Sequence, residues 1–218
     1  DRHVFAALML AHGHGDGLVT GATRKSAHVM DLINHVFDAG TEQGAVGVTA
    51  LFHKGRIVLI TDTLVHEWPD EEDLATIAER AAEVARGLGL EPRVAYVSFS
   101  TFGYPRSERA EKMNHAPSVL EKRGVDFEFE GEMTVDVALN TAVQENYPFQ
   151  RLPGPANILV VPARHSASIS TKLMQEMAGA TVIGPILAGI DKSIQIASNG
   201  STASDILNMA VLAACKVG

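Results

Sequence analysis

The chain has 218 residues, and its 18 lysines and arginines against 26 aspartates and glutamates give a formal net charge of −8. Such an acidic chain is unsuited to the phosphate backbone of nucleic acids, so we expect no nucleic-acid partner. With 46% hydrophobic and 20% charged residues, the composition is typical of a globular protein and excludes disordered and collagen-like architectures.

The distribution of apolar residues and cysteine indicates the compartment. No apolar run approaches the roughly 20 residues of a membrane-spanning helix, so we expect no membrane partner. The single cysteine, Cys215, cannot form an internal disulfide, and we expect it to be a buried small residue of the last helix. These features predict a cytoplasmic protein. Because a helical pattern is already under way at Arg2, we also expect a piece of a longer polypeptide that begins without a signal peptide.

The first part of the chain predicts two helices, a strand and a β-hairpin. Apolar residues recur at helical spacing between Val29 and Phe37. Lys54-Gly55 is a two-residue turn between two β-rich runs. In chain order the expected elements are a helix over Arg2–His12, a strand over Leu18–Thr20, a helix after Lys25, and strands over Gly47–His53 and Arg56–Asp62.

The rest of the chain alternates between helices and strands. Pro69-Asp70 followed by acidic residues predicts a helix start, and that helix ends near Gly87. The next expected elements are a strand over Arg93–Phe99, a helix over Ser107–Arg123 kinked at Pro117, a strand over Val125–Phe129, a helix over Met133–Glu145, a strand over Ile158–Val161, a helix over Ser166–Ala178, a strand over Val182–Ile183 and a helix over Thr202–Lys216. Asp38–Gly44 and Leu152–Pro155 are expected linkers. The alternation predicts an α/β fold in three α/β/α layers with mainly parallel sheets.

Two local patterns near the N-terminus are expected to be turn residues only. The run Gly13-x-Gly15-x-Gly17 follows a predicted helix and precedes a strand, the reverse of a dinucleotide fingerprint. His12, His14 and Asp16 have a ligand-like spacing, but spacing alone is weak evidence for a metal site. We therefore predict no metal ligands in this chain.

Small polar residues lie near the ends of several predicted elements, where ligands of open α/β sheets bind. These segments are Thr20–Thr23, Ser98–Thr101, Arg164–Ser166 and Ser198–Ser201. Their hydroxyls and amides suit phosphate or carboxylate oxygens, with arginine or lysine as counter-charge. The alternative is that the serines and threonines only cap helices. The candidate ligand-binding residues are Thr20, Gly21, Arg24, Lys25, Ser100, Thr101, Arg164, Ser198 and Asn199.

Five blocks of sequence together resemble the phosphate acetyltransferase family. They are Asp16–Gly21, Glu91–Thr101, Glu130–Asp136, Gly154–Pro162 and Gly179–Ile186, and they span nearly the whole chain. In finer detail, Thr181–Ile186 and Ser204–Ala210 resemble the phosphotransacetylase-like C-terminal domain of large bacterial NADP-dependent malic enzymes.

The resemblance implies two α/β lobes, as in isocitrate and isopropylmalate dehydrogenases, with coenzyme A and acetyl phosphate bound in the cleft between them. On this chain, residues 1–42 and 185–218 would form part of lobe I, and residues 43–184 would form lobe II. Lobe I would then be incomplete at its N-terminus.

The resemblance also implies a site near the last helix. Active members use a Ser-Arg pair and an aspartate there; Ser198 and Asp205 match, whereas Asn199 replaces the arginine and Asp31 aligns with a second arginine. Losing one guanidinium and reversing another charge should cost several kcal/mol of transition-state stabilisation. We therefore expect acetyl-CoA binding without acetyl transfer.

Three functions remain open on the sequence. The first is a regulatory and oligomerising domain that senses acetyl-CoA, dimerises through lobe II and joins a larger, hexameric assembly. The N-terminal malic-enzyme domain of the same polypeptide would convert malate to pyruvate and CO2 with NADP and Mg²⁺ or Mn²⁺. The second is a working transferase, with Asp205 as base toward the thiol and Ser198 holding the tetrahedral intermediate. The third is a structural scaffold without ligand.

Overall fold

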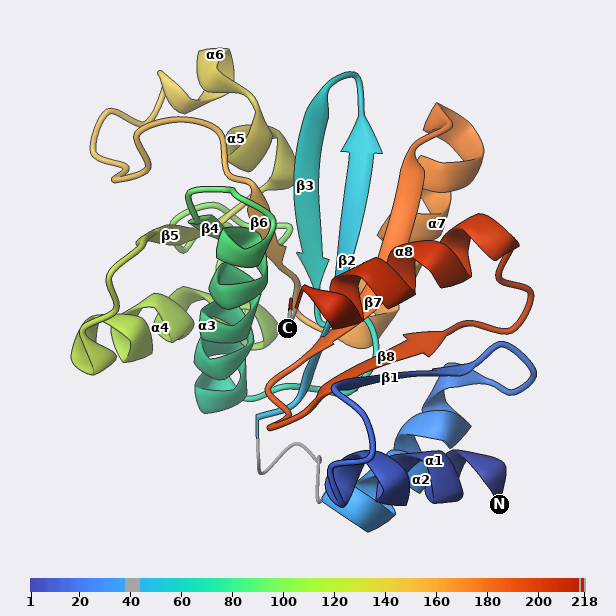
Figure 1. Cartoon of the computed structure of the whole chain (residues 1–218). Helices are drawn as coiled ribbons and strands as arrows, with labels where there is room; N and C mark the ends of the chain where they lie inside the picture. The colour runs from blue at the N-terminus through green and yellow to red at the C-terminus, as the bar shows by residue number, and fades with distance from the viewer. Residues whose placement is uncertain (38–43, 216, 218) are drawn as a thin grey trace.

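A six-stranded sheet forms the centre of the larger part of the molecule (Figure 1). The computed structural model describes residues 1–37, 44–215 and 217. In spatial order the strands are β5 (Glu128–Met133), β4 (Arg93–Val97), β6 (Ile158–Val160), β3 (Arg56–Thr61), β2 (Val46–His53) and β7 (Thr181–Ala188). The first four run parallel, and β2 is antiparallel to both of its neighbours.

Helices cover both faces of this sheet. Alternating strand residues point to opposite sides, so Leu59 packs in the core under α3 while Ile60 packs in the core on the other face. The helices are α3 (Glu71–Gly87) and α4 (Glu108–Arg123) on the first face, and α5 (Val135–Leu139), α6 (Thr141–Gln144) and α7 (Arg164–Ala178) on the second. The predicted three-layer α/β/α class is confirmed.

A second, two-stranded parallel sheet lies at the other end of the molecule. It consists of β1 (Gly17–Gly21) and β8 (Ser193–Ala197). Figure 1 shows α1 (Arg2–Ala11) and α2 (Ser26–Phe37) below this sheet and α8 (Ala203–Ala214) above it. A separate core that includes Val29, Ile33 and Ile196 fills the space between the sheet and α2.

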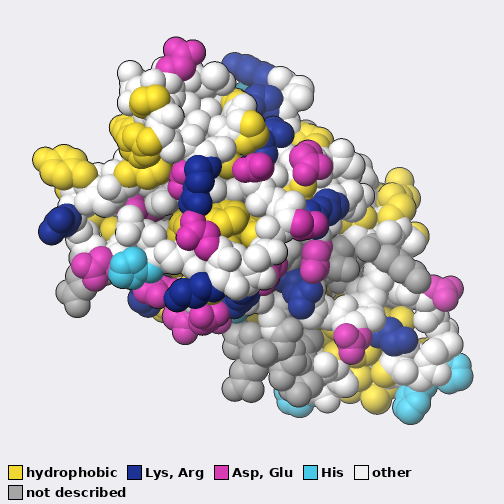
Figure 2. All heavy atoms as spheres, turned by 90° about the vertical axis from the view of Figure 1, so that its left-hand side faces the viewer, with side chains coloured by type: hydrophobic (Ala, Val, Ile, Leu, Met, Phe, Trp, Pro, Cys, Tyr) yellow, Lys and Arg dark blue, Asp and Glu magenta, His cyan; other side chains and the backbone are white. Residues whose placement is uncertain are grey.

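The face over α3 and α4 carries interspersed charges of both signs (Figure 2). Arg123 pairs with Glu72 and Glu79, and Arg86 pairs with Asp126. Exposed pairs of this kind contribute little to stability because solvent screens them. The charges drawn on this face in Figure 2 therefore do not form a patch of one sign.

Several predicted elements are confirmed close to their predicted ends. The hairpin of β2 and β3 turns at Lys54-Gly55. Helix α3 begins with a capping box in which Asp70 accepts from the Asp73 N–H at 2.9 Å and the Asp73 carboxylate accepts from the Asp70 N–H at 3.0 Å. Helix α4 continues through Pro117. Among the described residues, no helix has both the length and the apolar character to cross a membrane.

The predictions around β5 were wrong. The strand extends to Met133, and the predicted long helix is two short ones that meet at Asn140, whose extended backbone breaks it. The end of the strand was not recognised because it contains two charged residues, Glu130 and Glu132, which are rare inside a buried strand. Both are buried and accept hydrogen bonds, Glu130 from the Arg151 N–H at 3.0 Å. Glu132 accepts from the Asn114 side chain at 2.6 Å.

The C-terminal region differs from the prediction in three ways. Strand β8 was missed because the polar Gln195 interrupts its apolar pattern; Gln195 is buried and accepts from the Leu187 N–H at 3.0 Å. Strand β7 is longer than Val182–Ile183. Cys215 was expected to be buried, but it caps the end of α8 and is exposed.

The structure shows where one expected linker and one expected lobe boundary lie. Of the first linker only Gly44 belongs to the described residues, and Lys216 also lies outside them. The second linker lies in the loop between α6 and β6. Strand β7 pairs with β2 from Thr181 to Ala188 and so crosses the expected boundary after residue 184. The division into residues 1–42 with 185–218 and 43–184 stays a prediction.

Candidate functional site

A cavity of about 420 Å³ lies between α7, β7 and the segment that joins β8 to α8. Most of its polar lining consists of hydroxyl and amide groups. These come from Thr49, Thr63, Ser168, Thr171, Gln175, Ser198, Asn199, Ser201 and Asn208. The cavity thus contains three residues singled out from the sequence, namely Ser198, Asn199 and Asp205.

One wall of the cavity arises from an irregularity in the β2–β7 pairing. The register shifts at Thr49, so this residue has no paired partner on β7. Gly184 on β7 has a φ of +137°, and a Cβ there would lie 2.9 Å from the Val48 carbonyl oxygen. The Thr49 hydroxyl lies 2.9 Å from that of Thr63, which donates to the Gly47 carbonyl at 3.0 Å. A pair of positioned hydroxyls therefore lines this wall.

The β1–β8 pairing places Ser198 in the cavity. Gly21 pairs with Ala197, and the Ala22 N–H donates to the Ala197 carbonyl at 2.7 Å. The Ser198 hydroxyl then lies 3.4 Å from that of Ser26 at the start of α2. The predicted segments 20–23 and 198–201 are thereby brought together. Thr20 and Gly21 do not line the cavity themselves; Gly21 pairs with Ala197, directly before Ser198.

Asp205 is already engaged by its own helix. Its carboxylate accepts from the Thr202 N–H and the Thr202 hydroxyl, each at 2.8 Å, in a capping box at the start of α8. These hydrogen bonds lower the pKa of Asp205. A carboxylate with a lowered pKa is a weaker general base.

Of the described residues that line the cavity, Lys172 is the one with a basic side chain. No carboxylate in the described part of the chain forms an ion pair with it. Lys172 was not predicted from the sequence, although a signal was present. Ser168, Thr171, Lys172 and Gln175 have the spacing i, i+3, i+4 and i+7, which places them on one face of α7.

The predicted cation Arg164 lies outside the cavity lining. Its guanidinium donates to the Leu64 carbonyl at 3.1 Å and to the Glu67 carboxylate at 3.3 Å. Arg164 therefore fixes the loop after β3 instead of supplying the cavity's charge.

The two residues predicted after β4 also lie apart from the cavity. Ser100 is buried, and the Thr101 hydroxyl accepts from the Thr134 N–H at 3.2 Å. The strand order explains the separation, because β6 and β3 lie between β4 and the strands that border the cavity.

The predicted residues near the N-terminus pack around a buried histidine. The Thr20 hydroxyl lies 2.6 Å from Nδ1 of His3. Burial, together with the nearby Arg2 and Arg24, lowers the pKa of His3. Arg24 is exposed and does not line the cavity. Among the described residues, which include His12, His14 and Asp16, no group of three potential metal ligands comes together.

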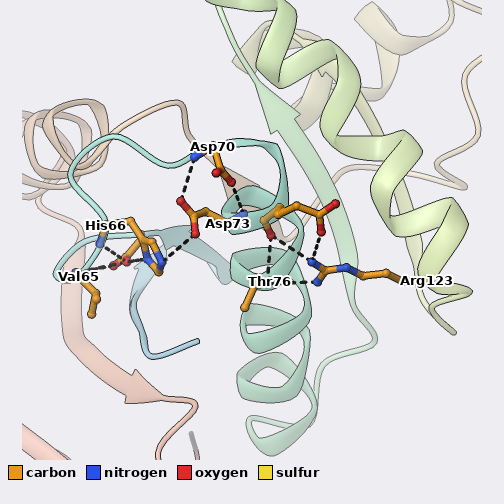
Figure 3. A network of polar contacts seen from close by, with 8 residues as sticks. Val65, His66, Asp70, Asp73, Thr76 and Arg123 are labelled. Carbon is orange, nitrogen blue, oxygen red and sulfur yellow. Dashed lines mark hydrogen bonds and ion pairs between the residues drawn. The ribbon is translucent and has the colours of Figure 1, made fainter. Parts of the chain in front are cut away.

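The loop between β3 and α3 carries His66, whose ring points toward Asp73 at the start of α3 (Figure 3), and the buried Asp62 holds this loop. Its carboxylate accepts from the backbone N–H groups of Gly47 and Leu64 at 3.0 and 2.7 Å, and from the N–H and ring of His66 at 2.8 Å each. Nε2 of His66 lies 3.7 Å from Asp73. This network fixes the position of Thr63 in the cavity wall.

Comparison with known proteins identifies the fold family. The family model described as phosphate acetyl/butaryl transferase matches residues 1–214. The chain belongs to this family. It is 30% identical over 220 residues to the phosphate acetyltransferase of Bacillus subtilis, and the aligned region covers 99% of this chain and 68% of that relative.

Other relatives of this phosphate acetyl/butaryl transferase family member are malic enzymes. The chain is 51% identical over 218 residues to the NADP-dependent malic enzyme of Rhizobium meliloti, and 34% identical over 215 residues to that of Escherichia coli. All of this chain matches the first and 96% matches the second, but it spans only 29% and 28% of their lengths. The family resemblance stated from the sequence is confirmed.

Solved structures agree with the family assignment. A phosphotransacetylase from Streptococcus pyogenes superposes with a TM-score of 0.91 at 27% identity, over 100% of this chain and 67% of that one. A 4-hydroxythreonine-4-phosphate dehydrogenase from Klebsiella pneumoniae superposes with a TM-score of 0.61 at 14% identity, over 99% of this chain and 68% of that one. The second comparison concerns the fold alone and fits the expected dehydrogenase-like architecture.

Proposed function

We propose that this chain is the C-terminal, phosphotransacetylase-like domain of a cytoplasmic NADP-dependent malic enzyme and that it binds acetyl-CoA as a regulatory ligand without transferring the acetyl group. Its 51% identity to a malic enzyme over all 218 residues supports the polypeptide context. The N-terminal domain would carry out the oxidative decarboxylation of malate with NADP and a divalent metal. Regulation requires acetyl-CoA to bind two states of the whole enzyme with different affinity.

The neutral Asn199 carries the proposed loss of catalysis, and the hydrogen bonding of Asp205 supports it. The cavity contains Ser198 and Asp205, but the neutral Asn199 stands where the family resemblance implies an arginine. Asp205, the expected base, has a lowered pKa because Thr202 donates two hydrogen bonds to it. The cavity therefore retains binding groups while its base and its charge stabilisation are both weakened.

A second candidate function is an active phosphate acetyltransferase. Lys172 favours it, because an ammonium group in the cavity can partly replace the missing guanidinium. A lysine offers a point charge in place of the planar bidentate fork of arginine, so the replacement is incomplete. We therefore rank binding without turnover first.

The two functions are separated by calorimetric titration of acetyl-CoA into the chain, together with an acetyl-phosphate turnover assay on the same preparation. We expect binding and no turnover. Turnover would establish the transferase, and the absence of both would leave the structural scaffold. In the full polypeptide, an unchanged acetyl-CoA response after deletion of this domain would contradict the regulatory proposal.

Replacing Lys172 by alanine is expected to weaken acetyl-CoA binding about tenfold or more, because a charged hydrogen-bond donor to an oxygen of the acyl arm contributes roughly 1.5–3 kcal/mol. The dissociation constant from calorimetry at two salt concentrations measures the change, and the variant should also show the weaker salt dependence. Lys192→Ala, on the exposed β7–β8 loop, is the matched control and should bind like the parent. Equal affinity of Lys172→Ala and the parent would remove Lys172 from the site.

We also propose that the domain forms a homodimer within a larger assembly, and that α7 supplies an apolar contact. Ile169, Leu173 and Met177 have exposed fractions of 66%, 58% and 79% and recur every fourth residue on one helix face. Lys172, Ser168 and the other cavity residues lie on a different side of α7. A symmetric dimer can bury such a stripe against its own copy.

Leu173→Glu is expected to shift the chain from dimer toward monomer in sedimentation velocity, because it places a charge at the centre of this stripe. Its acetyl-CoA affinity should stay unchanged, since Leu173 does not line the cavity. Phe5→Glu on α1, also exposed, is the control and should leave the sedimentation coefficient unaltered. Dissociation by Phe5→Glu, with no effect of Leu173→Glu, would place the interface at the other end of the molecule.

A further inference from the structure

An exposed Trp–His stack follows two neighbouring strands in the middle of the central sheet. Trp68 is 70% exposed, and its ring centroid lies 5.3 Å from that of His165 with the ring planes tilted by 33°. Trp68 follows β3, and His165 lies in the first turn of α7 after β6. Because β3 and β6 are parallel neighbours, both aromatic residues follow their carboxyl ends, where open α/β sheets bind ligands.

Both segments that carry the stack are held in place by hydrogen bonds. The Arg164 side chain joins α7 to the Leu64 carbonyl and to the Glu67 carboxylate, directly before Trp68. At the other end of the loop, Asp62 accepts from the N–H groups of Leu64, at 2.7 Å, and His66, at 2.8 Å. A loop held in this way loses little backbone freedom when a ligand binds to the indole that it carries.

The elements that carry Trp68 and His165 also supply residues to the cavity wall. His165 and Ser168 are three residues apart on α7 and lie on the same face, and Ser168 lines the cavity. Thr63, from the same loop as Trp68, lines it too. A ligand that enters the cavity between Thr63 and Lys172 can therefore extend along α7 toward the exposed indole.

We propose that Trp68, backed by His165, is the stacking surface for the purine base of a nucleotide-bearing acyl thioester whose acyl end occupies the cavity. This inference rests on the proposed acetyl-CoA binding and extends it to a second part of the ligand. A cavity of about 420 Å³ lies near the lower end of the range for drug-sized ligands, so the nucleotide end of so long a ligand lies outside it. A planar base gains from stacking on an exposed indole.

Trp68 is the sole tryptophan of the chain, so its fluorescence reports directly on this surface. Titration with acetyl-CoA and with ADP should quench the emission saturably. The acyl arm alone, tested as S-acetyl-N-acetylcysteamine, should not quench it. Calorimetric binding of acetyl-CoA without any change in emission would overturn the proposal.

Substitutions test the same surface without relying on emission. Trp68→Leu should weaken acetyl-CoA binding about tenfold or more in calorimetry, whereas Trp68→Phe should keep most of the affinity because it retains an aromatic face. Phe149→Leu, at an aromatic residue that is 66% exposed elsewhere, is the control and should bind like the parent. Unchanged affinity of Trp68→Leu would also overturn the proposal.

The outcomes distinguish this inference from the proposed function. If acetyl-CoA fails to bind but ADP quenches Trp68 saturably, the proposed function fails and the purine surface stands. If no nucleotide alters the emission and the emission shifts on dilution of the protein, Trp68 is a protein–protein contact, as exposed tryptophans often are, and the proposal is overturned.

Discussion

Asp62→Ala is expected to lower the free energy of unfolding by about 4 kcal/mol or more, because buried donors left without an acceptor cost roughly 1–3 kcal/mol each. Asp62 is 2% exposed. Its carboxylate accepts hydrogen bonds from the N–H groups of Gly47, Leu64, Val65 and His66. Alanine leaves all four donors without this partner. Urea unfolding followed by circular dichroism measures the loss.

A matched control keeps this result specific. Asp191→Ala removes a carboxylate from the exposed β7–β8 loop and should change the free energy of unfolding by less than about 0.5 kcal/mol. Asp62→Asn should fall between the two variants, because the amide keeps one acceptor oxygen and loses the negative charge. If the free energy of unfolding of Asp62→Ala lies within about 1 kcal/mol of the parent value, the loop is held mainly by Arg164 and not by Asp62.

The same loop shows where sequence reasoning succeeds and where it fails. The acidic start of α3 was predictable because residues 70–73 form a local capping pattern. Asp62 was not recognised as a structural anchor because its partners include Gly47, fifteen positions earlier in the chain. Interactions across strands depend on register, which a local pattern does not specify.

The residues of the candidate site show the same difference between local patterns, which the sequence reveals, and contacts that depend on the sheet order. Ser198 and Asn199 were found because they belong to a polar segment before the last helix, and Asp205 was found through the family resemblance. Arg164, Ser100 and Thr101 were grouped with them on the rule that ligands lie at strand ends, yet the sheet order places them elsewhere. Lys172 was overlooked because candidates were sought near the ends of predicted strands, whereas Lys172 lies in the middle of α7, whose polar face supplies one wall of the cavity.

Gly21→Val is expected to disrupt the β1–β8 sheet and to abolish acetyl-CoA binding. Gly21 has a φ of +108°, a conformation unfavourable for a β-branched residue, and a Cβ there would lie 2.2 Å from the Ala197 carbonyl oxygen. No side-chain rotation relieves a clash between Cβ and backbone. Since Ala197 precedes Ser198, displacement of β8 also moves the cavity's serine away from Thr49 and Lys172.

Hydrogen exchange distinguishes this local effect from global unfolding. Amides of β1 and β8 should lose protection in Gly21→Val, by a free energy of several kcal/mol, while those of β4 and β6 stay protected because a separate core holds them. Gly15→Val is the control, because the nearest atom to its Cβ is the Gly17 carbonyl oxygen at 3.8 Å. Equal loss of protection in both sheets would show that the two unfold as one cooperative unit, so that the binding defect would follow from global instability. Retained protection of β8 together with lost binding would place the defect in the geometry of Ser198 itself.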